Sequence, residues 1–417
     1  MPFGNNINYA AVFNRILDEK FYIMPRTMWM ENTTPGIQWN GGKEIKIPML
    51  SMDGLGDMQN CQAPDGSMAL DWETKTLEYW RGRNFQICRY EIDMTNLALT
   101  VENALRVLLN EHVVPELDKI RIGRLVQAAF SYGANCIKAQ ASSGITADNI
   151  LGLLLNDIAT VQDKIGENQQ LYIQISTQLK NLLQQSSQIT RFLDVKDYQI
   201  RSITTRIEAI NDQYLIGTPS RDMGSVFQLN DGRSEGQTVG GVTFGDLGPG
   251  VNWIVAARPV VDAVARPRIT KVIDPDVNQD GEFWKIMFSI YHGVWTYQNK
   301  QDGLLVNVNK ELGDLTVESV SAGSGQTVIT VNAAGNADTQ LVYKTDASAA
   351  PTVTFGTALT ASDGWAPLPE GGQIAGTNGQ YVTVALVGTQ SGLPLASGNA
   401  TIVSGTLIRR KYGVHNL

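Results

Sequence analysis

Residues 43–93 read KEIKIPMLSMDGLGDMQNCQAPDGSMALDWETKTLEYWRGRNFQICRYEID. Ile45, Ile47 and Met49 alternate with other residues as they would on a β-strand, and a second alternating run extends from Leu70 to Asp93. A tract rich in turn-forming residues, 51–66, separates the two runs. This order predicts one long β-hairpin. An isolated hairpin is only marginally stable in water, so we expect this one to rest on a partner.

A long helix is predicted after the hairpin. Thr100 is a suitable N-cap, and apolar residues recur at helical spacing from Val101 to Ala129. Pro115 lies inside this pattern, where its missing N–H should kink the helix. About 30 residues at about 1.5 Å each span roughly 45 Å, which is long for a small core and indicates a spine.

Shorter elements surround this helix. Residues before about 40 have little regular pattern and predict an arm, with a brief amphipathic helix over Tyr9–Lys20. Beyond the spine, the pattern predicts helices over 146–161 and 177–185, a Gly-rich loop over 232–250, and strands over 171–175, 203–210, 251–256, 269–273 and 282–297. Helices and strands alternate without a regular βαβ repeat, which predicts an α+β fold.

The composition changes after about Gly313. Residues 315–407 hold five acidic residues and one basic residue, Lys344. Short alternating strands are predicted at 328–331, 340–343, 381–387 and 399–403, with Gly, Asn and Pro between them. This pattern predicts a small β-sandwich appended to the first part of the chain. A chain that ends near Gly313 is therefore expected to assemble without this module.

The charge pattern argues against a protein that grips nucleic acid. The formal net charge is −8, and the densest basic stretch is only Arg409, Arg410 and Lys411. Phosphate binding usually needs a basic patch, so if this protein meets DNA, we expect it to enclose the DNA rather than to hold it. The three cysteines are widely spaced and predict no disulfide framework. We expect no signal peptide, and no apolar run is long enough to span a membrane.

No catalytic constellation is predicted. The chain has no G-x-S-x-G motif, and residues 41–44 lack the spacing of a P-loop. Its three histidines, His112, His292 and His415, are scattered and form no metal or triad pattern, and His112 is expected to be structural. We therefore expect a protein that is not an enzyme and has no cofactor and no metal.

The segment 276–281, DVNQDG, is similar to the first half of a calcium-binding loop. The twelfth position of such a loop should carry a glutamate, and here it is Met287. We therefore interpret the segment as a turn in which Asp and Asn side chains bind their own backbone.

Charged and aromatic residues of the hairpin are the candidate interface residues. Carboxylates in its second half stand close in sequence to Lys75 and two arginines, which favours ion pairs between strands or between subunits over catalysis. Tryptophans there are expected to be core or interface anchors. The predicted subunit-interface residues are Asp71, Trp72, Glu73, Trp80, Arg81, Arg83 and Pro115.

Four motifs follow one another along the chain. They are KIP and MDGLGD at 46–57 with LDWET and RGR at 70–83, VPELD at 114–118, IGTPSRDM at 216–223, and DPDVNQD at 274–280. In this order they resemble the major capsid proteins of tailed bacteriophages, over roughly Asn8 to Asn309. The segment with Tyr343-Lys344, Trp365 and GQYVTV at 379–384 is similar to the immunoglobulin-like domains fused to phage structural proteins.

The resemblance implies a Hong Kong 97-type α+β fold. Its parts would be an N-terminal arm (1–42), an extended loop hairpin (43–94), peripheral and axial domains (95–312, with the axial domain at about 145–244), an immunoglobulin-like surface domain (313–407) and a tail (408–417). The N-terminal segment is too short for a fused scaffold, which implies a separate scaffolding protein. The Lys–Asn pair that crosslinks some members has no recognisable counterpart here.

The resemblance also implies a function. The chain would be a structural subunit that self-assembles as hexamers and pentamers into an icosahedral or prolate head, matures from a procapsid and encloses double-stranded DNA without specific binding. A portal would be a further partner, no membrane would be involved, and assembly in the bacterial cytoplasm would give a virion. Alternatives are a tail-tube or baseplate protein, against which the long helix argues, an encapsulin-type nanocompartment, against which the appended domain argues, and a secreted adhesin or hydrolase.

Overall fold

A computed structural model describes residues 26–31, 38–39, 44–58, 65–90, 104, 106–186, 193–200, 203–244, 247–323 and 325–404. The predicted helix at 9–20 and the predicted tail at 408–417 lie outside these residues. The chain forms two compact units, one of residues 1–24, 30–111 and 262–295, the other of 25–29, 112–261 and 296–417. The described elements include both helices and many strands, as expected of an α+β fold.

The first unit contains the predicted hairpin. Its arms are β2 (Glu44–Met52) and β3 (Met68–Thr76), which pair antiparallel from Glu44 opposite Thr76 to Met52 opposite Met68. The short strand β1 (Gln38–Trp39) adds to the outer side of β2. The alternation of the sequence therefore predicted that these two segments pair as the arms of a hairpin.

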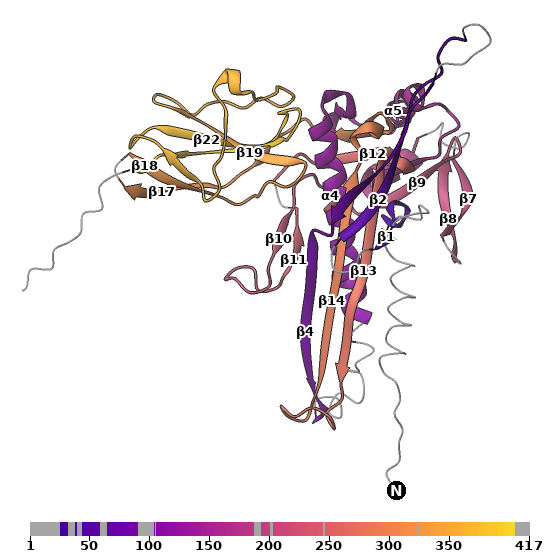
Figure 1. Ribbon diagram of the computed structural model, residues 1–417, viewed down its shortest axis with the longest axis horizontal. Coiled ribbons are helices and arrows are strands. Elements are labelled where there is room, and N and C mark those ends of the chain that lie inside the picture. Colours follow the sequence, from indigo (N-terminus) through magenta and orange to yellow (C-terminus); the bar gives the residue numbers. More distant parts are fainter. Residues whose placement is uncertain are drawn as a thin grey trace, which may run out of the picture. The chain divides into compact units, whose positions relative to one another are not determined.

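The prediction that the second arm continues to Asp93 is wrong. The chain leaves the hairpin after β3, and β4 (Tyr79–Cys88) pairs antiparallel with β14 (Phe283–Thr296). With β13 (Val261–Ile273) these strands form a second sheet in the order β13-β14-β4, drawn as three long strands in Figure 1. Ile286, Phe288 and Ile290 of β14 are buried on the face that they share with Ile87 and Tyr79 of β4. Burial of this apolar face gives β4 a better partner than β2.

The long helix has nearly the predicted extent but is less regular, and the described residues 104, 106 and 107 are already helical. A π-helical segment, η2 (Leu108–Val113), leads into α4 (Val114–Tyr132). Pro115 directly follows this segment, and because residues 106–113 before it are helical too, it lies within the long helical element rather than at its start. The helix therefore departs from regular α geometry next to the proline, where a kink was predicted. His112 lies on this irregular turn and is exposed.

A mixed seven-stranded sheet forms the centre of the second unit. Its order is β5-β15-β12-β6-β9-β8-β7, and β6 and β12 are buried along their whole length. The strands are β5 (Ile137–Ala139), β6 (Leu171–Ser176), β7 (Leu193–Ile200), β8 (Ile203–Ile210), β9 (Gln213–Thr218), β12 (Val251–Ala257) and β15 (Leu304–Val308). The hairpin of β10 (Gln228–Asn230) and β11 (Gly241–Thr243) lies in the predicted Gly-rich region.

Two further helices, both predicted, flank this sheet. They are α5 (Ile150–Ile165) and α6 (Thr177–Gln184), and the hydroxyl of Ser176 accepts a hydrogen bond from Leu179 N as the N-cap of α6. Asp157 of α5 is buried and accepts hydrogen bonds from Trp253 Nε1 (2.8 Å) and Asn307 Nδ2 (3.0 Å). These bonds from β12 and β15 fix α5 on the sheet.

The C-terminal module consists of two sheets, as the strand pattern predicted. One has the order β16-β23-β22-β19-β20 and the other β17-β18-β21. The strands are β16 (Gly313–Asp314), β17 (Val317–Gly323), β18 (Gln326–Val331), β19 (Thr339–Asp346), β20 (Ala366–Pro367), β21 (Gln373–Ala375), β22 (Tyr381–Gly388) and β23 (Pro394–Thr401). Ile329 and Ile374 of one sheet share a core with Val382 and Val384 of the other, which makes the module a β-sandwich. Its likeness to immunoglobulin domains stays a prediction.

Candidate assembly surfaces

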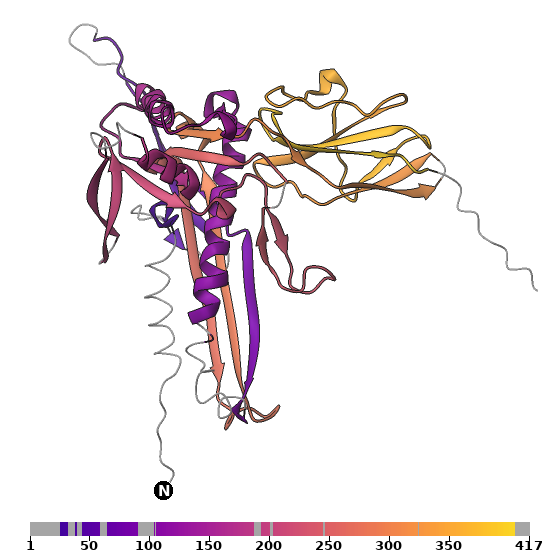
Figure 2. The ribbon, with the colours of Figure 1, turned by 180° about the vertical axis from the view of Figure 1, so that it is seen from behind.

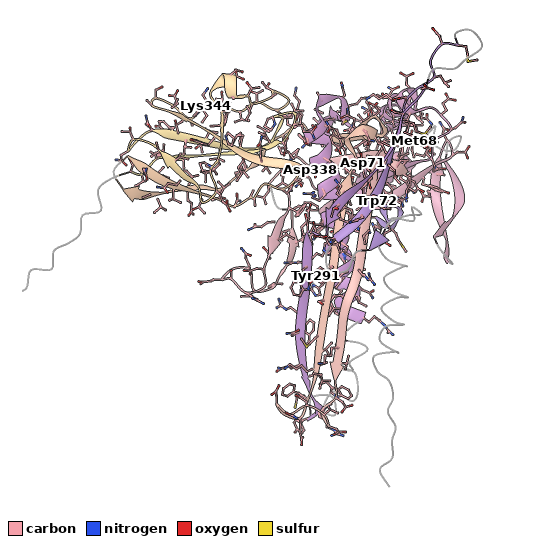
Figure 3. All side chains as sticks on the ribbon, viewed as in Figure 1. Met68, Asp71, Trp72, Tyr291, Asp338 and Lys344 are labelled. Atoms are coloured by element: carbon pink, nitrogen blue, oxygen red, sulfur yellow. The ribbon has the colours of Figure 1, made fainter. Side chains whose placement is uncertain are left out.

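The end of the hairpin exposes large apolar side chains. We call residues 50–72 the hairpin tip, of which 50–58 and 65–72 are described. Leu55 is fully exposed and Met68 is 71% exposed, and the other exposed apolar residues are Met52, Met58, Leu70 and Trp72. Scattered apolar residues are normal on a surface, but so many on one projecting element indicate an interaction site. Figure 3 marks Met68, Asp71 and Trp72 along this element.

Hydrogen bonds close the two strands of the tip. Asp53 Oδ2 accepts hydrogen bonds from the backbone N–H and the hydroxyl of Ser67, each at 2.7 Å, and Asp53 N donates to Ser67 O at 3.1 Å. The N–H and hydroxyl of Ser67 lower the pKa of the exposed Asp53 carboxyl. Met52, Met68, Leu70 and Trp72 are therefore carried on paired strands, whereas Leu55 and Met58 follow the end of β2.

The hairpin tip is acidic. Residues 50–72 contain four carboxylates and no lysine or arginine, and the four are Asp53, Asp57, Asp65 and Asp71. Exposed apolar side chains surrounded by one sign of charge select a partner of the opposite sign.

The sheet β13-β14-β4 is basic. Its three strands contain one acidic residue, Asp262, and six basic residues, which are Arg81, Arg83, Arg266, Arg268, Lys271 and Lys285. We call this the basic sheet. This basic surface could not be predicted from the sequence, because the six basic residues are spread over about two hundred positions and form no run. Only the pairing of β4 with β14 brings them into one sheet.

Six of the seven predicted interface residues lie on strand β3 of the hairpin or on strand β4 of the basic sheet. Asp71 and Trp72 are exposed on β3, and Glu73 lies on the same strand, although its side chain is outside the described part. Arg81, Arg83 and Trp80 lie on β4, opposite Ile290, Phe288 and Tyr291 of β14. Pro115 is half-buried at the start of α4 and belongs to neither sheet.

Aromatic pairs order the end of β4. The ring of Trp80 is 60% exposed and stacks on Tyr291, with centroids 5.0 Å apart. On the other face, Tyr79 stacks on the buried His292, also at 5.0 Å. Trp80 is thus the anchor-like residue of this sheet that faces solvent.

The segment resembling a calcium loop is a turn between β13 and β14. Asn278 Nδ2 donates to Phe283 O (2.9 Å), and Asp280 forms an ion pair with Lys285 (3.3 Å). Asp276 pairs with Arg89 at 3.2 Å. Within the described ranges, no group of three His, Cys, Asp or Glu side chains is placed to hold a metal ion.

The base of the C-terminal module binds α4. Arg124 Nη2 lies 3.1 Å from Asp338 Oδ2, and Asn336 Nδ2 donates to Gln127 Oε1 at 2.8 Å. Phe130 meets Phe355 edge to face, with ring centroids 6.2 Å apart, and Phe130 O accepts a hydrogen bond from the hydroxyl of Ser391. Figures 2 and 3 show the module extending from α4, with Asp338 marked at the junction.

The junction leaves no space for additional side-chain atoms. A Cβ atom placed on Gly388 of β22 would lie 2.4 Å from Phe130 O. The backbone of the module therefore packs directly on the backbone of α4, and the module covers a helix that is otherwise part of the central core.

A buried carboxylate of α4 holds the described end of the arm. Asp118 accepts hydrogen bonds from Arg26 N (3.1 Å) and from the N–H (3.0 Å) and hydroxyl (2.5 Å) of Thr27. Burial raises the pKa of the Asp118 carboxyl, against these hydrogen bonds and the charge of Arg121. Nothing in the local sequence distinguishes Asp118 from an exposed helical aspartate.

In the part of the chain that the structure describes, no helix is both long enough and apolar enough to cross a membrane.

Comparison with known proteins found no matching family model and no matching curated protein. Several solved structures are similar. The capsid of the cyanophage P-SCSP1u aligns with 65% of this chain and 85% of its own at 11% identity and a TM-score of 0.46. The mature capsid of bacteriophage PhiM1 aligns with 67% of this chain and 90% of its own at 10% identity and a TM-score of 0.40. A virus-like particle from Pyrococcus furiosus aligns with 70% of this chain and 96% of its own at 10% identity and a TM-score of 0.40. Two of these three structures are phage capsids and the third is a virus-like particle.

Proposed function

We propose that this chain is the repeating subunit of a closed protein shell, the head of a tailed bacteriophage, which encloses double-stranded DNA. The observation that carries the proposal is the hairpin tip, which exposes six large apolar side chains. The order of the four sequence motifs supports a phage head over other shells.

The exposure of the tip has a cost that assembly removes. Burying apolar surface stabilises by about 25 cal/mol per Å², so each large side chain of the tip gains about 1.5–3 kcal/mol if it is fully covered. A contact repeated around a closed symmetric shell multiplies this gain without any strong single interface. The exposed apolar tip therefore favours a subunit that assembles, and it would be unfavourable in a protein that stays a monomer.

Charge complementarity supports a second copy as the partner. The tip carries four carboxylates and no base, whereas the basic sheet carries six bases and one acid. In the proposed contact, the tip of one copy lies on the basic sheet of its neighbour, with Trp72 and Leu70 supplying apolar contact. Because the four carboxylates of the tip and Arg83, Arg266 and Lys271 of the basic sheet are exposed, this attraction should weaken as salt is added.

The remaining parts of the proposal concern partners and location. A separate scaffolding protein would direct closure, a portal would occupy one vertex, and the DNA would be enclosed without specific binding. The chain would be divided into the N-terminal arm, the extended loop hairpin, and the peripheral and axial domains that the resemblance implies. The β-sandwich would be an immunoglobulin-like domain on the outer surface. Assembly would take place in the bacterial cytoplasm and end in the virion.

Charge exchange between the two surfaces tests the proposed contact. Asp71→Lys on the tip and Arg83→Asp on the basic sheet should each reduce shell yield, because each places like charges opposite each other. The double variant restores opposite charges, so its yield should recover toward that of the unchanged protein. Yield is measured as the shell fraction after gradient sedimentation and electron microscopy.

The control is Glu318→Lys, a change at an exposed position of the module. It alters the net charge as Asp71→Lys does and should leave shell yield unchanged. A double variant that assembles no better than the worse single variant would reject the pairing of tip and basic sheet. Soluble DNA that competes with assembly would instead assign the basic sheet to nucleic acid.

A further inference from the structure

The exposed methionines of the described chain all lie on the hairpin tip. Seven methionine side chains are described, and three of them, Met52, Met58 and Met68, are 65–71% exposed. Met28, Met30 and Met223 are buried, and Met287 is half-buried. Among the described methionine side chains, exposure is therefore confined to one element, the element that is proposed to dock.

The three thioethers lie on or beside the closing end of the hairpin. Met52 and Met68 are directly opposite in the β2–β3 register, next to the Asp53–Ser67 hydrogen bonds. Met58 follows six residues after Met52, on the far side of the fully exposed Leu55. Methionine is flexible and polarisable, so such a tip can fit a neighbouring surface that differs slightly from one position in a shell to another.

We propose that Met52, Met58 and Met68 form an oxidant-sensitive docking site, in which conversion to methionine sulfoxide prevents the hairpin tip from binding a second copy. This inference rests on the proposed function. Hydrogen peroxide is the oxidant: a sulfur lone pair attacks one peroxide oxygen, the O–O bond breaks, an S–O bond forms and water leaves. The sulfur loses two electrons and the peroxide gains them.

Oxidation makes the methionine side chain more polar and should therefore weaken the contact. A thioether is apolar, whereas a sulfoxide is polar and accepts hydrogen bonds, so its burial against a neighbour is unfavourable. Losing the burial of one methionine side chain, about 1.5–3 kcal/mol, weakens a contact by about tenfold or more. Three oxidised side chains on one tip should therefore stop assembly, while the folded subunit, which leaves them in solvent, keeps its stability.

Assembly should in turn protect the tip methionines from oxidation. A tip covered by a neighbour is shielded from peroxide. The same methionines should thus react quickly in the free subunit and slowly in the finished shell. Met30 and Met223 provide internal references, because both are buried within the subunit itself.

The experiment treats purified full-length subunits with hydrogen peroxide and then maps the added oxygen by peptide mass spectrometry. A thiol reductant then reverses disulfides, sulfenic acids and other reversible oxidation of Cys61 and Cys88, and methionine sulfoxide reductases reverse oxidation of methionine. Assembly is measured before peroxide, after peroxide and after each reducing treatment. We expect oxidation of the three tip methionines ahead of Met30 and Met223, loss of assembly by about tenfold or more, and recovery only with the reductases.

Two variants complete the experiment. Met52→Leu/Met58→Leu/Met68→Leu removes the thioethers, and its response to peroxide is expressed relative to its own untreated assembly. That ratio should stay near one. Met223→Leu, a matched change at a buried position, should retain both assembly and its loss after peroxide.

Several results would overturn the inference. They are unaffected assembly of subunits with an oxidised tip, recovery with the thiol reductant alone, and a triple variant that is as sensitive as the unchanged chain. If untreated subunits form no shells at all, the proposed function fails instead. Peptide mapping then still decides the modification site, because preferential oxidation of the tip does not depend on assembly.

Discussion

Arg124 of α4 and Asp338 of the C-terminal module form an ion pair of 3.1 Å across the base of the module, with side-chain exposures of only 3% and 18%. A buried guanidinium needs a compensating charge, since its hydration is lost. The pair therefore ties the module to the helix at the centre of the second unit.

Asp338→Asn should destabilise the protein by about 3 kcal/mol, because it leaves the charge of Arg124 buried without its carboxylate partner. Urea denaturation of the unassembled subunit measures this change. Glu318→Gln removes an exposed carboxylate of the same module and should change the free energy of unfolding by less than about 0.5 kcal/mol. Equal stabilities of the two variants would show that the ion pair does not hold the junction.

Gly388→Val tests the close packing of backbone on backbone at the same junction. The added side chain meets Phe130 O and must displace β22 from α4, which should cost about 2 kcal/mol. Gly152→Ala is the matched control, because Gly152 is an exposed position of α5 with open space around it. That change should stabilise the protein by up to about 1 kcal/mol.

The junction revises the expectation for a chain that ends near Gly313. Removing the module uncovers Phe130 and leaves Arg124 without Asp338, so the shortened chain should be largely insoluble or protease-sensitive. Limited proteolysis and circular dichroism measure this directly. A soluble shortened chain that forms smooth shells would show that the module is a separable surface domain after all.

Leu55→Ser should separate assembly from folding. Leu55 is fully exposed, so the change removes no contact in the subunit and its melting temperature should stay the same. Shell yield should fall, since the polar side chain contributes no apolar burial at a subunit contact. Val277→Ser, at an exposed turn outside the tip, should affect neither property.

Tyr132 gives a pH prediction. Burial raises the pKa of its phenol to about 12 from 10.0, against the effect of its 2.7 Å hydrogen bond with Thr296. Between these values the unfolded chain loses the Tyr132 proton and the folded chain keeps it, so stability falls as the pH rises from about 10 to about 12. In Tyr132→Phe, unfolding over this range should release about one proton fewer, measured as a shallower slope of stability against pH. An unchanged slope would contradict the raised pKa.

Local patterns predicted local structure. The alternation of Ile45, Ile47 and Met49 predicted β2, and the runs around Val328 and Val384 predicted strands of the sandwich. Both depend only on which face of a strand is buried. The pairing of β4 with β14 could not be predicted in this way, because the two strands lie about two hundred residues apart and their partner choice depends on the shared buried face.

The candidate surfaces show the same limit. Asp71 was predicted as an ion-pair residue and Trp72 as a core or interface anchor, and both are exposed on β3. Arg266 and Lys271 were not predicted as interface residues, because they form a basic surface only together with residues on other strands. Asp338 and Gly388 resemble ordinary loop and strand-end residues in sequence, and only the fold places them against Arg124 and Phe130.

The central claim is that copies of this chain close into a shell through the hairpin tip. Cryo-electron microscopy of the full chain, produced together with the proposed scaffolding protein, tests it most directly. The account predicts closed shells in which the β2–β3 tip of each copy lies on the β13-β14-β4 sheet of a neighbour. Monomers, open tubes, or shells whose hairpin tips remain exposed to solvent would contradict it.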